Sequence, residues 1–535
     1  MSGFKKIAVI GAGTMGSAIA GQIANADQEV LLLDLPKRDG DEQSPAEKAI
    51  RRLIKSDPPA LVHKSKAELI QTGDLENDFD KLADCDWIIE AIVERLPLKK
   101  DLYKRLDATI KPDCLVTSNT STIPIKLLVE DMPKAFRQRF AITHYFNPVR
   151  YMRLLELVRG EDTAPEAMDR LAAYNDEILG KGVVQCADTP GFLGNRVGVF
   201  ALQVGMDEAH RQGISIEAAD ALAGRPMGIP KTGVFGLYDL IGVDLMSDVV
   251  DTLEDILPAG DAFYAAGKNG PVKPMIAKMI EAGFTGEKSG KGGFYREVDG
   301  QELALDLTTG EMRPRATQLP MAAQAAAETQ AKNGEALLDL VEPAVGTPEN
   351  ETIFARRYLA RVPAYAADLI PAVTTSPQDI DDAMKLGFNW VRGPFEMMDA
   401  LGHARVVELI KEAGLELPAV LESSEPFYKA QNGSLDVRVE GDFKPVSLPE
   451  GTIRFSFTRK TLDPLFQNAS ASLWPLEGDL RLIEFHSKAN ALTAVSLEAI
   501  EAAVDNPGKG IIVHNDAQHF SAGVDLNAFR AMIEA

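Results

Sequence analysis

The chain has 535 residues, three cysteines and a formal net charge of −23 at pH 7. Its length exceeds what one hydrophobic core supports and predicts about three or four domains, while its negative charge disfavours nucleic acid and anionic membrane as partners. The cysteines lack metal-ligand or disulfide spacing, so we expect no metal site and a reducing compartment. No apolar run approaches the roughly 18 residues of a membrane span, and the first strand begins too near the N-terminus for a signal peptide. We therefore expect a cytoplasmic protein.

A short apolar strand turns on glycine and opens into a helix at residues 7–16, IAVIGAGTMG. Gly11 permits the tight turn, Gly13 lets the backbone approach a pyrophosphate, and Gly16 lets the helix pack closely on the strand. A second buried strand ends in Asp34, where a carboxylate can hold both adenosine ribose hydroxyls and repel a 2′-phosphate. We therefore predict a dinucleotide site that takes NAD rather than NADP, with contacts from Gly11, Gly13, Met15, Gly16 and Asp34.

Two further strands, predicted at 85–92 and 114–118, end in polar side chains. Those at the first strand are Glu90, Glu94 and Lys99, and the second leads into residues 119–121, Asn-Thr-Ser. Because the carboxyl ends of parallel strands line the binding crevice of an open α/β sheet, we expect these side chains at the site.

The segment 139–148 ends at a Pro148 turn and leads into the apolar stretch 154–158. The turn predicts two strands that lie side by side, which brings His144 near Glu156. In such a pair the carboxylate fixes the histidine tautomer while the other ring nitrogen faces a substrate. The alternative, a structural histidine and an exposed glutamate, is disfavoured by the apolar residues on both sides of Glu156.

From about residue 187 the pattern becomes helical, and the sequence G-x-F-x₃-D-x₂-G at 233–242 recurs at 393–402, displaced by 160 residues. This predicts a second copy of a helical domain. The same displacement takes Asn195 to Ala355, so we expect the second copy to be a packing partner without catalysis.

Five motifs together resemble the L-3-hydroxyacyl-CoA dehydrogenase family, over residues 1 to about 435 when the duplicated helical domain is included. They are GAGTMG at 11–16, EAIVE at 90–94, SNTS at 118–121, HYFNP at 144–148 with LEL at 155–157, and TPGFLGNR at 189–196. The resemblance implies an α/β fold, in which a Rossmann-type NAD-binding domain precedes two all-α domains. It also implies NAD-dependent oxidation of (3S)-3-hydroxyacyl-CoA to 3-ketoacyl-CoA in fatty-acid β-oxidation.

Site roles follow from the same resemblance. His144 is implied as the catalytic base and Glu156 as its partner, Ser121 and Asn195 would hydrogen-bond the reacting oxygens, Glu94 and Lys99 would lie near the cofactor, and Asn147 would lie by the acyl-CoA. For the CoA phosphates the sequence offers Arg51, Arg52 and Lys55, with Lys48, on one face of a helix predicted at 44–56. A solvated basic face is the alternative for these residues.

Residues 477–535 resemble the opening of the enoyl-CoA hydratase/isomerase (crotonase) family, through LRLIEF at 480–485 and SAGVDL at 521–526. The resemblance implies that the Val524 N–H faces a thioester oxygen. The match stops where a second donor and catalytic carboxylates would follow. We therefore expect no hydratase activity, and interpret this segment as the truncated start of a domain from a longer bifunctional protein.

The expected organisation is an NAD-binding domain at 1–186, a helical domain at 187–297, a linker at 298–345, a second helical repeat at 346–433, a linker at 434–476 and the partial crotonase-like domain at 477–535. Relatives in the dehydrogenase family pair through the helical domains of two subunits, so the two copies are expected to pair within this chain. The resemblance also raises a thiolase as a partner.

Two other functions stay open from the sequence. One is a 3-hydroxybutyryl-CoA dehydrogenase that works reductively, which cofactor preference and chain-length profile distinguish. The other is a non-enzymatic NAD-binding structural protein, which the joint presence of His144, Glu156, Ser121 and Asn195 disfavours. Acyl-chain length, direction and oligomeric state do not follow from the motifs.

Overall fold

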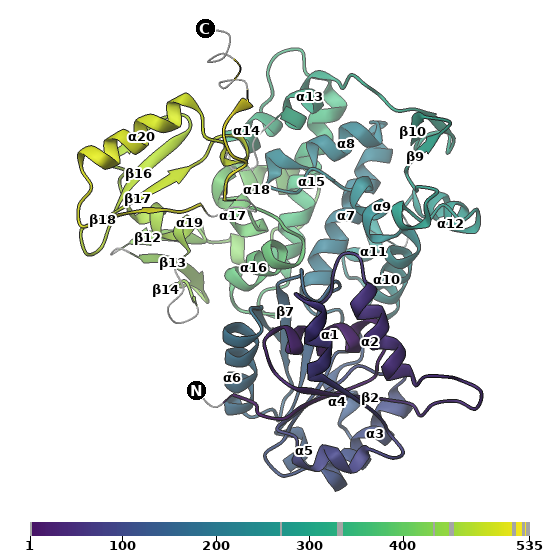
Figure 1. Ribbon diagram of the computed structural model, residues 1–535. Coiled ribbons are helices and arrows are strands. Elements are labelled where there is room, and N and C mark those ends of the chain that lie inside the picture. The colour runs from purple at the N-terminus through teal and green to yellow at the C-terminus, as the bar shows by residue number, and fades with distance from the viewer. Residues whose placement is uncertain are drawn as a thin grey trace. The chain divides into compact units, whose positions relative to one another are not determined.

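The computed structural model describes residues 3–267, 270–328, 335–431, 434–448, 454–515, 520–526 and 530. The chain divides into two compact units, Met1–Glu425 and Pro426–Ala535 (Figure 1). Among the described residues, no helix has both the length and the apolar character needed to cross a membrane.

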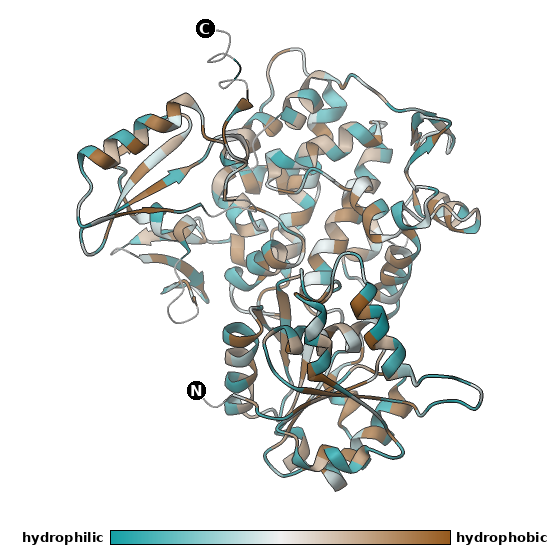
Figure 2. Ribbon diagram, viewed as in Figure 1, coloured by the Kyte–Doolittle hydropathy of each residue, from teal (hydrophilic) through white to brown (hydrophobic). Residues whose placement is uncertain are grey.

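The first unit opens with an eight-stranded sheet of order β3-β2-β1-β4-β5-β6-β7-β8. Its strands are β1 Ile7–Ile10, β2 Val30–Asp34, β3 Ile70–Asp74, β4 Trp87–Glu90, β5 Leu115–Ser118, β6 Phe140–Tyr145, β7 Leu154–Arg159 and β8 Gly182–Ala187. Neighbouring strands run parallel except β6 and β7, which are antiparallel. Figure 2 shows mostly hydrophobic strands, as expected for a sheet covered on both faces.

Helices connect these strands, and the strand order reverses between β1 and β4, which is where open α/β sheets bind ligands. The helices are α1 Thr14–Asn25, α2 Pro45–Lys55, α3 Leu96–Thr109, α4 Ile125–Leu128, α5 Lys134–Arg137 and α6 Pro165–Ala173. Ser44 and Glu47 form a capping box at the start of α2, which explains why that helix begins there. The predicted Rossmann-type domain is confirmed, with β3 and β8 as strands that the sequence analysis did not include.

Two sets of helices follow the sheet. The first contains α7 Gly194–Gln212, α8 Ile216–Leu222, α9 Phe235–Ile241, α10 Val243–Ile256, α11 Phe263–Ala266 and α12 Lys273–Glu281, and the second contains α15 Glu349–Asp368, α16 Pro377–Gly387, α17 Pro394–Leu401 and α18 His403–Glu412. Asp220 on α8 accepts the backbone N–H of Phe235 at 2.7 Å, and Asp381 on α16 accepts that of Phe395 at 2.9 Å. An equivalent aspartate therefore caps the third helix of each set, and the internal repeat predicted from the sequence is present in the structure.

The two helical sets pack on each other through α7 and α15. The Arg361 guanidinium lies 2.6 Å from Asp207 and 2.7 Å from Glu208, and both carboxylates are buried. Arg357 also contacts Glu208, at 2.8 Å, and Arg211 contacts Asp207 at the same distance. A buried ion-pair cluster therefore holds the two helices together.

The second helical set also reaches the nucleotide-binding sheet. A Cβ on Gly387 would lie 2.6 Å from the Leu154 side chain on β7, and one on Gly182 would lie 2.3 Å from Leu386. The backbone N–H of Ala187 donates to the Val373 carbonyl at 2.8 Å. Because these contacts leave no space for a side chain, α16 packs directly against the last two strands.

Regular structure fills much of the two ranges that were expected to be linkers. The first contains part of the small sheet β9 Tyr295–Val298, β10 Gln301–Leu305 and β11 Met312–Pro314, followed by α13 Met321–Glu328 and α14 Glu335–Val341. Helix α13 packs on α8, and α14 packs on α15. Two alanines of α13, Ala323 and Ala326, are buried in this packing.

The second unit contains two small sheets. One is β12 Tyr428–Gln431, β13 Ser434–Val439 and β14 Asp442–Pro445, and the other is β15 Phe466–Gln467, β16 Ala471–Leu476, β17 Leu480–Phe485 and β18 Gly510–Val513, with helices α19 Phe455–Thr458 and α20 Ala494–Asp505. Strands β17 and β18 are parallel and joined through α20, whereas β16 pairs antiparallel to β17. This sheet begins before residue 477, inside the range 434–476 that was expected to be a linker.

Candidate functional site

The glycine turn between β1 and α1 has the shape that a pyrophosphate needs. Gly11 has a φ of +104°, and a Cβ there would lie 2.5 Å from the Ala91 carbonyl oxygen. A Cβ on Gly16 would lie 1.8 Å from the Gly11 carbonyl oxygen, whereas nothing lies within 4 Å of one on Gly13. Two glycines therefore allow close packing, and the third leaves the turn open beside the first N–H groups of α1, where an anion binds. Met15 is half-buried on the first turn of that helix.

Asp34 lies at the carboxyl end of β2, beside this turn. Its carboxylate accepts the backbone N–H of Ala12, and also that of Leu35 at 2.6 Å. Each oxygen keeps a second lone pair for a ribose hydroxyl. Arg52 on α2 donates to the Ala12 carbonyl at 2.8 Å, so this basic side chain lies at the dinucleotide turn. Together these contacts fit an NAD whose adenosine half lies over β2.

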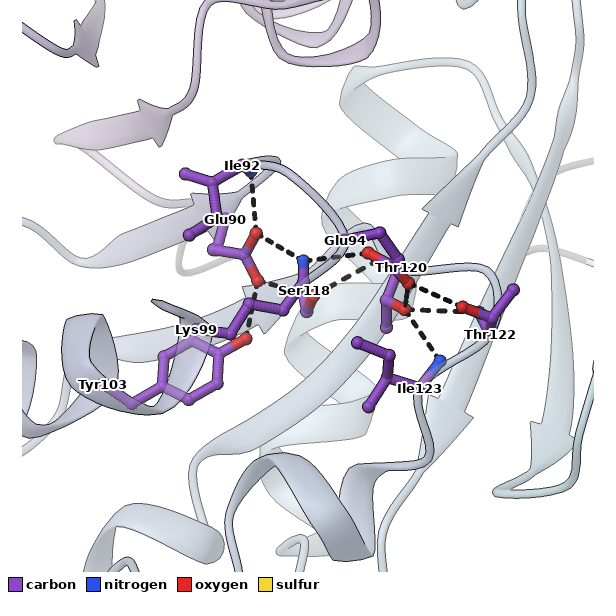
Figure 3. A network of polar contacts seen from close by, with 9 residues as sticks. All are labelled: Glu90, Ile92, Glu94, Lys99, Tyr103, Ser118, Thr120, Thr122 and Ile123. Carbon is purple, nitrogen blue, oxygen red and sulfur yellow. Dashed lines mark hydrogen bonds and ion pairs between the residues drawn. The ribbon is translucent and has the colours of Figure 1, made fainter. Parts of the chain in front are cut away.

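A buried carboxylate lies at the end of β4, on the other side of the reversal in strand order (Figure 3). Glu90 accepts four hydrogen bonds, from the backbone N–H of Ile92 at 2.8 Å and from the side chains of Lys99 at 2.7 Å, Tyr103 at 2.6 Å and Ser118 at 2.8 Å. Burial and the Glu90 charge raise the pKa of Tyr103 well above its usual value, so the phenol stays a donor. Every lone pair of this carboxylate is therefore used.

Lys99 continues the network outward, because its ammonium also lies 3.1 Å from Glu94. Glu94 in turn accepts the hydroxyls of Thr120 and Thr122, the latter at 2.9 Å. Burial acts to raise the pKa of Glu94, but the Lys99 charge and these hydroxyl donors outweigh it and lower the pKa below its usual value. The two threonines flank Ser121, which is half-buried, so the network fixes the backbone on both sides of that residue.

His144 and Glu156 are direct cross-strand partners in the antiparallel pair β6–β7. Such partners have neighbouring side chains, and the His144 Nδ1 lies 2.6 Å from the Glu156 Oε2. His144 is 7% exposed and Glu156 is fully buried. The Phe146 and Phe192 rings lie 4.6 and 5.8 Å from the imidazole, measured between centroids, so the pair is enclosed by apolar groups with one ring nitrogen left for a substrate.

The other oxygen of Glu156 is anchored to the first helical set. Its Oε1 accepts the backbone N–H of Leu193 at 2.9 Å and of Gly194 at 2.6 Å. Gly194 is the first residue of α7, and Asn195 follows it. The carboxylate thus links the histidine to the helix start that carries Asn195, which brings three predicted site residues to one place.

The remaining predicted residues are more scattered. Arg51 and Lys55 are exposed on α2, and Asn147 is exposed in the turn between β6 and β7. Val524 belongs to the second unit, where it is 57% exposed beside Gly523, whose φ is +90°. Arg52 of α2 contacts the dinucleotide turn. The roles of Arg51, Lys55, Asn147 and Val524 stay predictions.

Three further residues support the site. Glu90 is the buried partner of Lys99, Asn119 accepts the backbone N–H of Tyr145 at 2.9 Å, and Lys181 donates to the Met152 carbonyl at 3.0 Å in the β6–β7 turn. Burial lowers the pKa of Lys181 to about 8. Glu90 and Asn119 were predicted there from their places at strand ends, whereas the sequence analysis did not single out Lys181.

Sequence comparisons agree with this geometry. A family model described as the NAD binding domain of 3-hydroxyacyl-CoA dehydrogenase matches residues 6–189, and one described as its C-terminal domain matches both 191–297 and 354–431. The second match supports the internal repeat. The two family models leave residues 432–535 unmatched, and no crotonase domain was found there.

Relatives that match nearly the whole of this chain belong to the same family. A Rickettsia felis protein named as a fatty acid oxidation complex trifunctional enzyme is 35% identical over 99% of this chain and 70% of its own length. A Bacillus subtilis protein named as a 3-hydroxyacyl-CoA dehydrogenase is 31% identical over 98% of this chain and 68% of its own. The solved structure of a 3-hydroxybutyryl-CoA dehydrogenase from Escherichia coli has the same fold, with a TM-score of 0.58, 23% identity, and coverage of 79% of this chain and 98% of that one.

Proposed function

Because the chain belongs to the 3-hydroxyacyl-CoA dehydrogenase family, we propose that His144 is the base that takes the hydroxyl proton of a (3S)-3-hydroxyacyl-CoA, held in place by Glu156. The chain is an NAD-dependent dehydrogenase of fatty acid oxidation that acts on acyl-CoA thioesters. The observation that carries the proposal is the buried His144–Glu156 contact at 2.6 Å.

When bound, NAD⁺ supplies the acceptor for the hydride that leaves C3 of the substrate. The Nε2 of His144 takes the hydroxyl proton, and Glu156 holds Nδ1 and stabilises the imidazolium that forms. Asn195 and Ser121 would donate to the oxygen that becomes the keto group. Gly11, Gly13, Met15 and Gly16 would hold the pyrophosphate region, and Asp34 the adenosine ribose, with Glu94 and Lys99 on the nicotinamide side.

For the acyl-CoA we propose Asn147 and the basic residues of α2. Arg51 and Lys55 are exposed there for the CoA phosphates, whereas the contact of Arg52 with Ala12 places its charge at the dinucleotide turn. The second helical set would serve as the packing partner of the first, within one chain. A thiolase partner follows from the trifunctional relatives and belongs to the same proposal.

The purified chain is expected to oxidise NADH with acetoacetyl-CoA and to use NADPH far more poorly, because Asp34 repels a 2′-phosphate. The measurement is the loss of absorbance at the NADH band, with each cofactor and with longer 3-ketoacyl-CoAs. Equal or better use of NADPH would overturn the role of Asp34. A profile limited to four-carbon substrates, with reduction favoured, would instead identify a 3-hydroxybutyryl-CoA dehydrogenase.

We also propose that residues 477–535 form a crotonase-like segment. Two observations support it. The strands β17 and β18 form a parallel pair across α20, and the Leu492 N–H donates to the Gly523 carbonyl at 2.8 Å, which shapes the turn that carries Val524. His519, in the same motif, lies outside the described residues.

This chain is expected to leave crotonyl-CoA unhydrated, because one backbone donor without an acid/base pair does not activate water. The loss of enoyl absorbance measures hydration, with a crotonase as positive control. Hydration that vanished in a Gly523→Val variant would show that this segment completes a second active site.

A further inference from the structure

The network around Glu90 and Glu94 carries more negative than positive charge. It contains two carboxylates and the ammonium of Lys99, which contacts both, at 2.7 and 3.1 Å. Tyr103, Ser118, Thr120 and Thr122 complete it with neutral hydroxyls (Figure 3). If the two glutamates and the lysine are ionised, the group has a formal charge of −1.

The position of this group relative to the cofactor follows from the sheet. Residues Ile10 and Glu90 are register partners in β1 and β4, and Ala91 packs against the glycine turn. Asp34 lies on the opposite side, at the end of β2, where the adenosine half belongs. The nicotinamide half would therefore extend over β4 and β5, toward Glu94. This step rests on the proposed function.

The two oxidation states of the cofactor differ at that end by one charge, since the nicotinamide ring of NAD⁺ is cationic and that of NADH is neutral. A negative group near the ring attracts the cationic ring of NAD⁺ and has little effect on the neutral ring of NADH. We infer that Glu90 is a tuning residue for the cofactor: its buried charge makes the site bind NAD⁺ more tightly, relative to NADH, than a neutral residue would.

Burial makes Glu90 suited to this role. Its side chain is fully buried and Lys99 is 1% exposed, so water and salt screen their charges less than at the surface. Glu94 alone would be balanced by Lys99, and the second carboxylate makes the group anionic. Because protein donors use every lone pair of Glu90, this residue would act on the cofactor through its charge.

The test is Glu90→Gln, measured as the dissociation constants of NAD⁺ and NADH by calorimetry and by NADH fluorescence. The amide fits the cavity, because its oxygen keeps the Ile92 N–H and Lys99 while its NH₂ faces the hydroxyls of Tyr103 and Ser118, which rotate to accept. If the separation between the charge and the ring is taken as about 10 Å and the effective dielectric constant as roughly 20–40, NAD⁺ binding should weaken about 4- to 17-fold. The affinity for NADH should stay within about twofold.

Tyr103→Phe is the matched control, because it removes one hydrogen bond from the same carboxylate and keeps the charge. Its ratio of NAD⁺ to NADH affinity should equal that of the unmodified chain. Equal weakening of both cofactors in Glu90→Gln, or no change in either, would overturn the inference.

If Glu90→Gln fails to fold, Glu94→Gln replaces it, since that side chain is 39% exposed and the change removes the same unit of charge. It should shift the ratio in the same direction, and an equal effect on both cofactors would again overturn the inference. The proposed function fails separately, if the unmodified chain does not oxidise NADH with acetoacetyl-CoA or if His144→Ala keeps its turnover.

Discussion

Glu156→Gln is expected to lower turnover by about 10³-fold or more, as far as His144→Ala, although the amide has nearly the same shape. The reason is the second oxygen of Glu156, which accepts the backbone N–H groups of Leu193 and Gly194. The amide oxygen of Gln would take that place, because its NH₂ cannot face two donors. The NH₂ would then face Nδ1 of His144 and force the proton onto Nε2, the nitrogen that must accept the substrate proton.

The measurement is NADH oxidation with acetoacetyl-CoA, with NADH binding followed by fluorescence to show that both variants keep the cofactor site. Glu166→Gln is the control, since Glu166 is exposed on α6 and should leave turnover unchanged. A loss below about tenfold in Glu156→Gln would show that the ring keeps its tautomer without the carboxylate, and the proposed role of Glu156 would fall.

Arg361→Leu is expected to destabilise the pairing of the helical sets by about 3 kcal/mol, because it withdraws the cation shared by two buried carboxylates. Arg357→Leu should cost only about 1 kcal/mol, since that side chain is one-third exposed and better screened. The first urea-unfolding transition, followed by tryptophan fluorescence, measures both.

Adding Asp207→Asn and Glu208→Gln to Arg361→Leu should recover part of the lost stability, because the carboxylates then need no counter-charge. If Arg361→Leu shifted the transition no more than Arg357→Leu, the cluster would not be what holds α7 to α15. Turnover at low urea should be unchanged in all three variants, since none of these residues lies at the site.

The sequence predicted the pairing of β6 with β7 because Pro148 marks a turn between two apolar runs, and register then follows from the strands themselves. It predicted the glycine turn and Asp34 from a local pattern, in which a glycine motif between a strand and a helix is followed by a second buried strand that ends in an acid. The anchoring of Glu156 on Gly194 was not predictable, because it joins residues 38 apart through a helix start whose position depends on packing. The Glu90–Lys99 contact likewise depends on how α3 lies against the sheet.

The internal repeat shows where a constant displacement fails. Motifs at 233 and 393 differ by 160 residues, but the capping aspartates Asp220 and Asp381 differ by 161 and the helices α7 and α15 begin 155 residues apart. Ala355 is consequently the seventh residue of α15 and 1% exposed, whereas Asn195 is the second residue of α7. Short insertions in loops change such offsets without changing the fold.

The contact of Gly387 with Leu154 joins a strand to a helix that the ribosome makes much later. Strand β7 receives its final packing from α16, which is encoded roughly 230 residues later, and a ribosome adding about 5–20 residues per second needs roughly 10–50 s to cover that distance. Until α16 is made, Leu154 on β7 has its contact with the start of α7 at Gly194 but lacks its contact with Gly387. A nascent chain can therefore hold the His144–Glu156 pair and its anchor at Gly194 while β7 is still partly uncovered, and an apolar strand in that state is prone to aggregate.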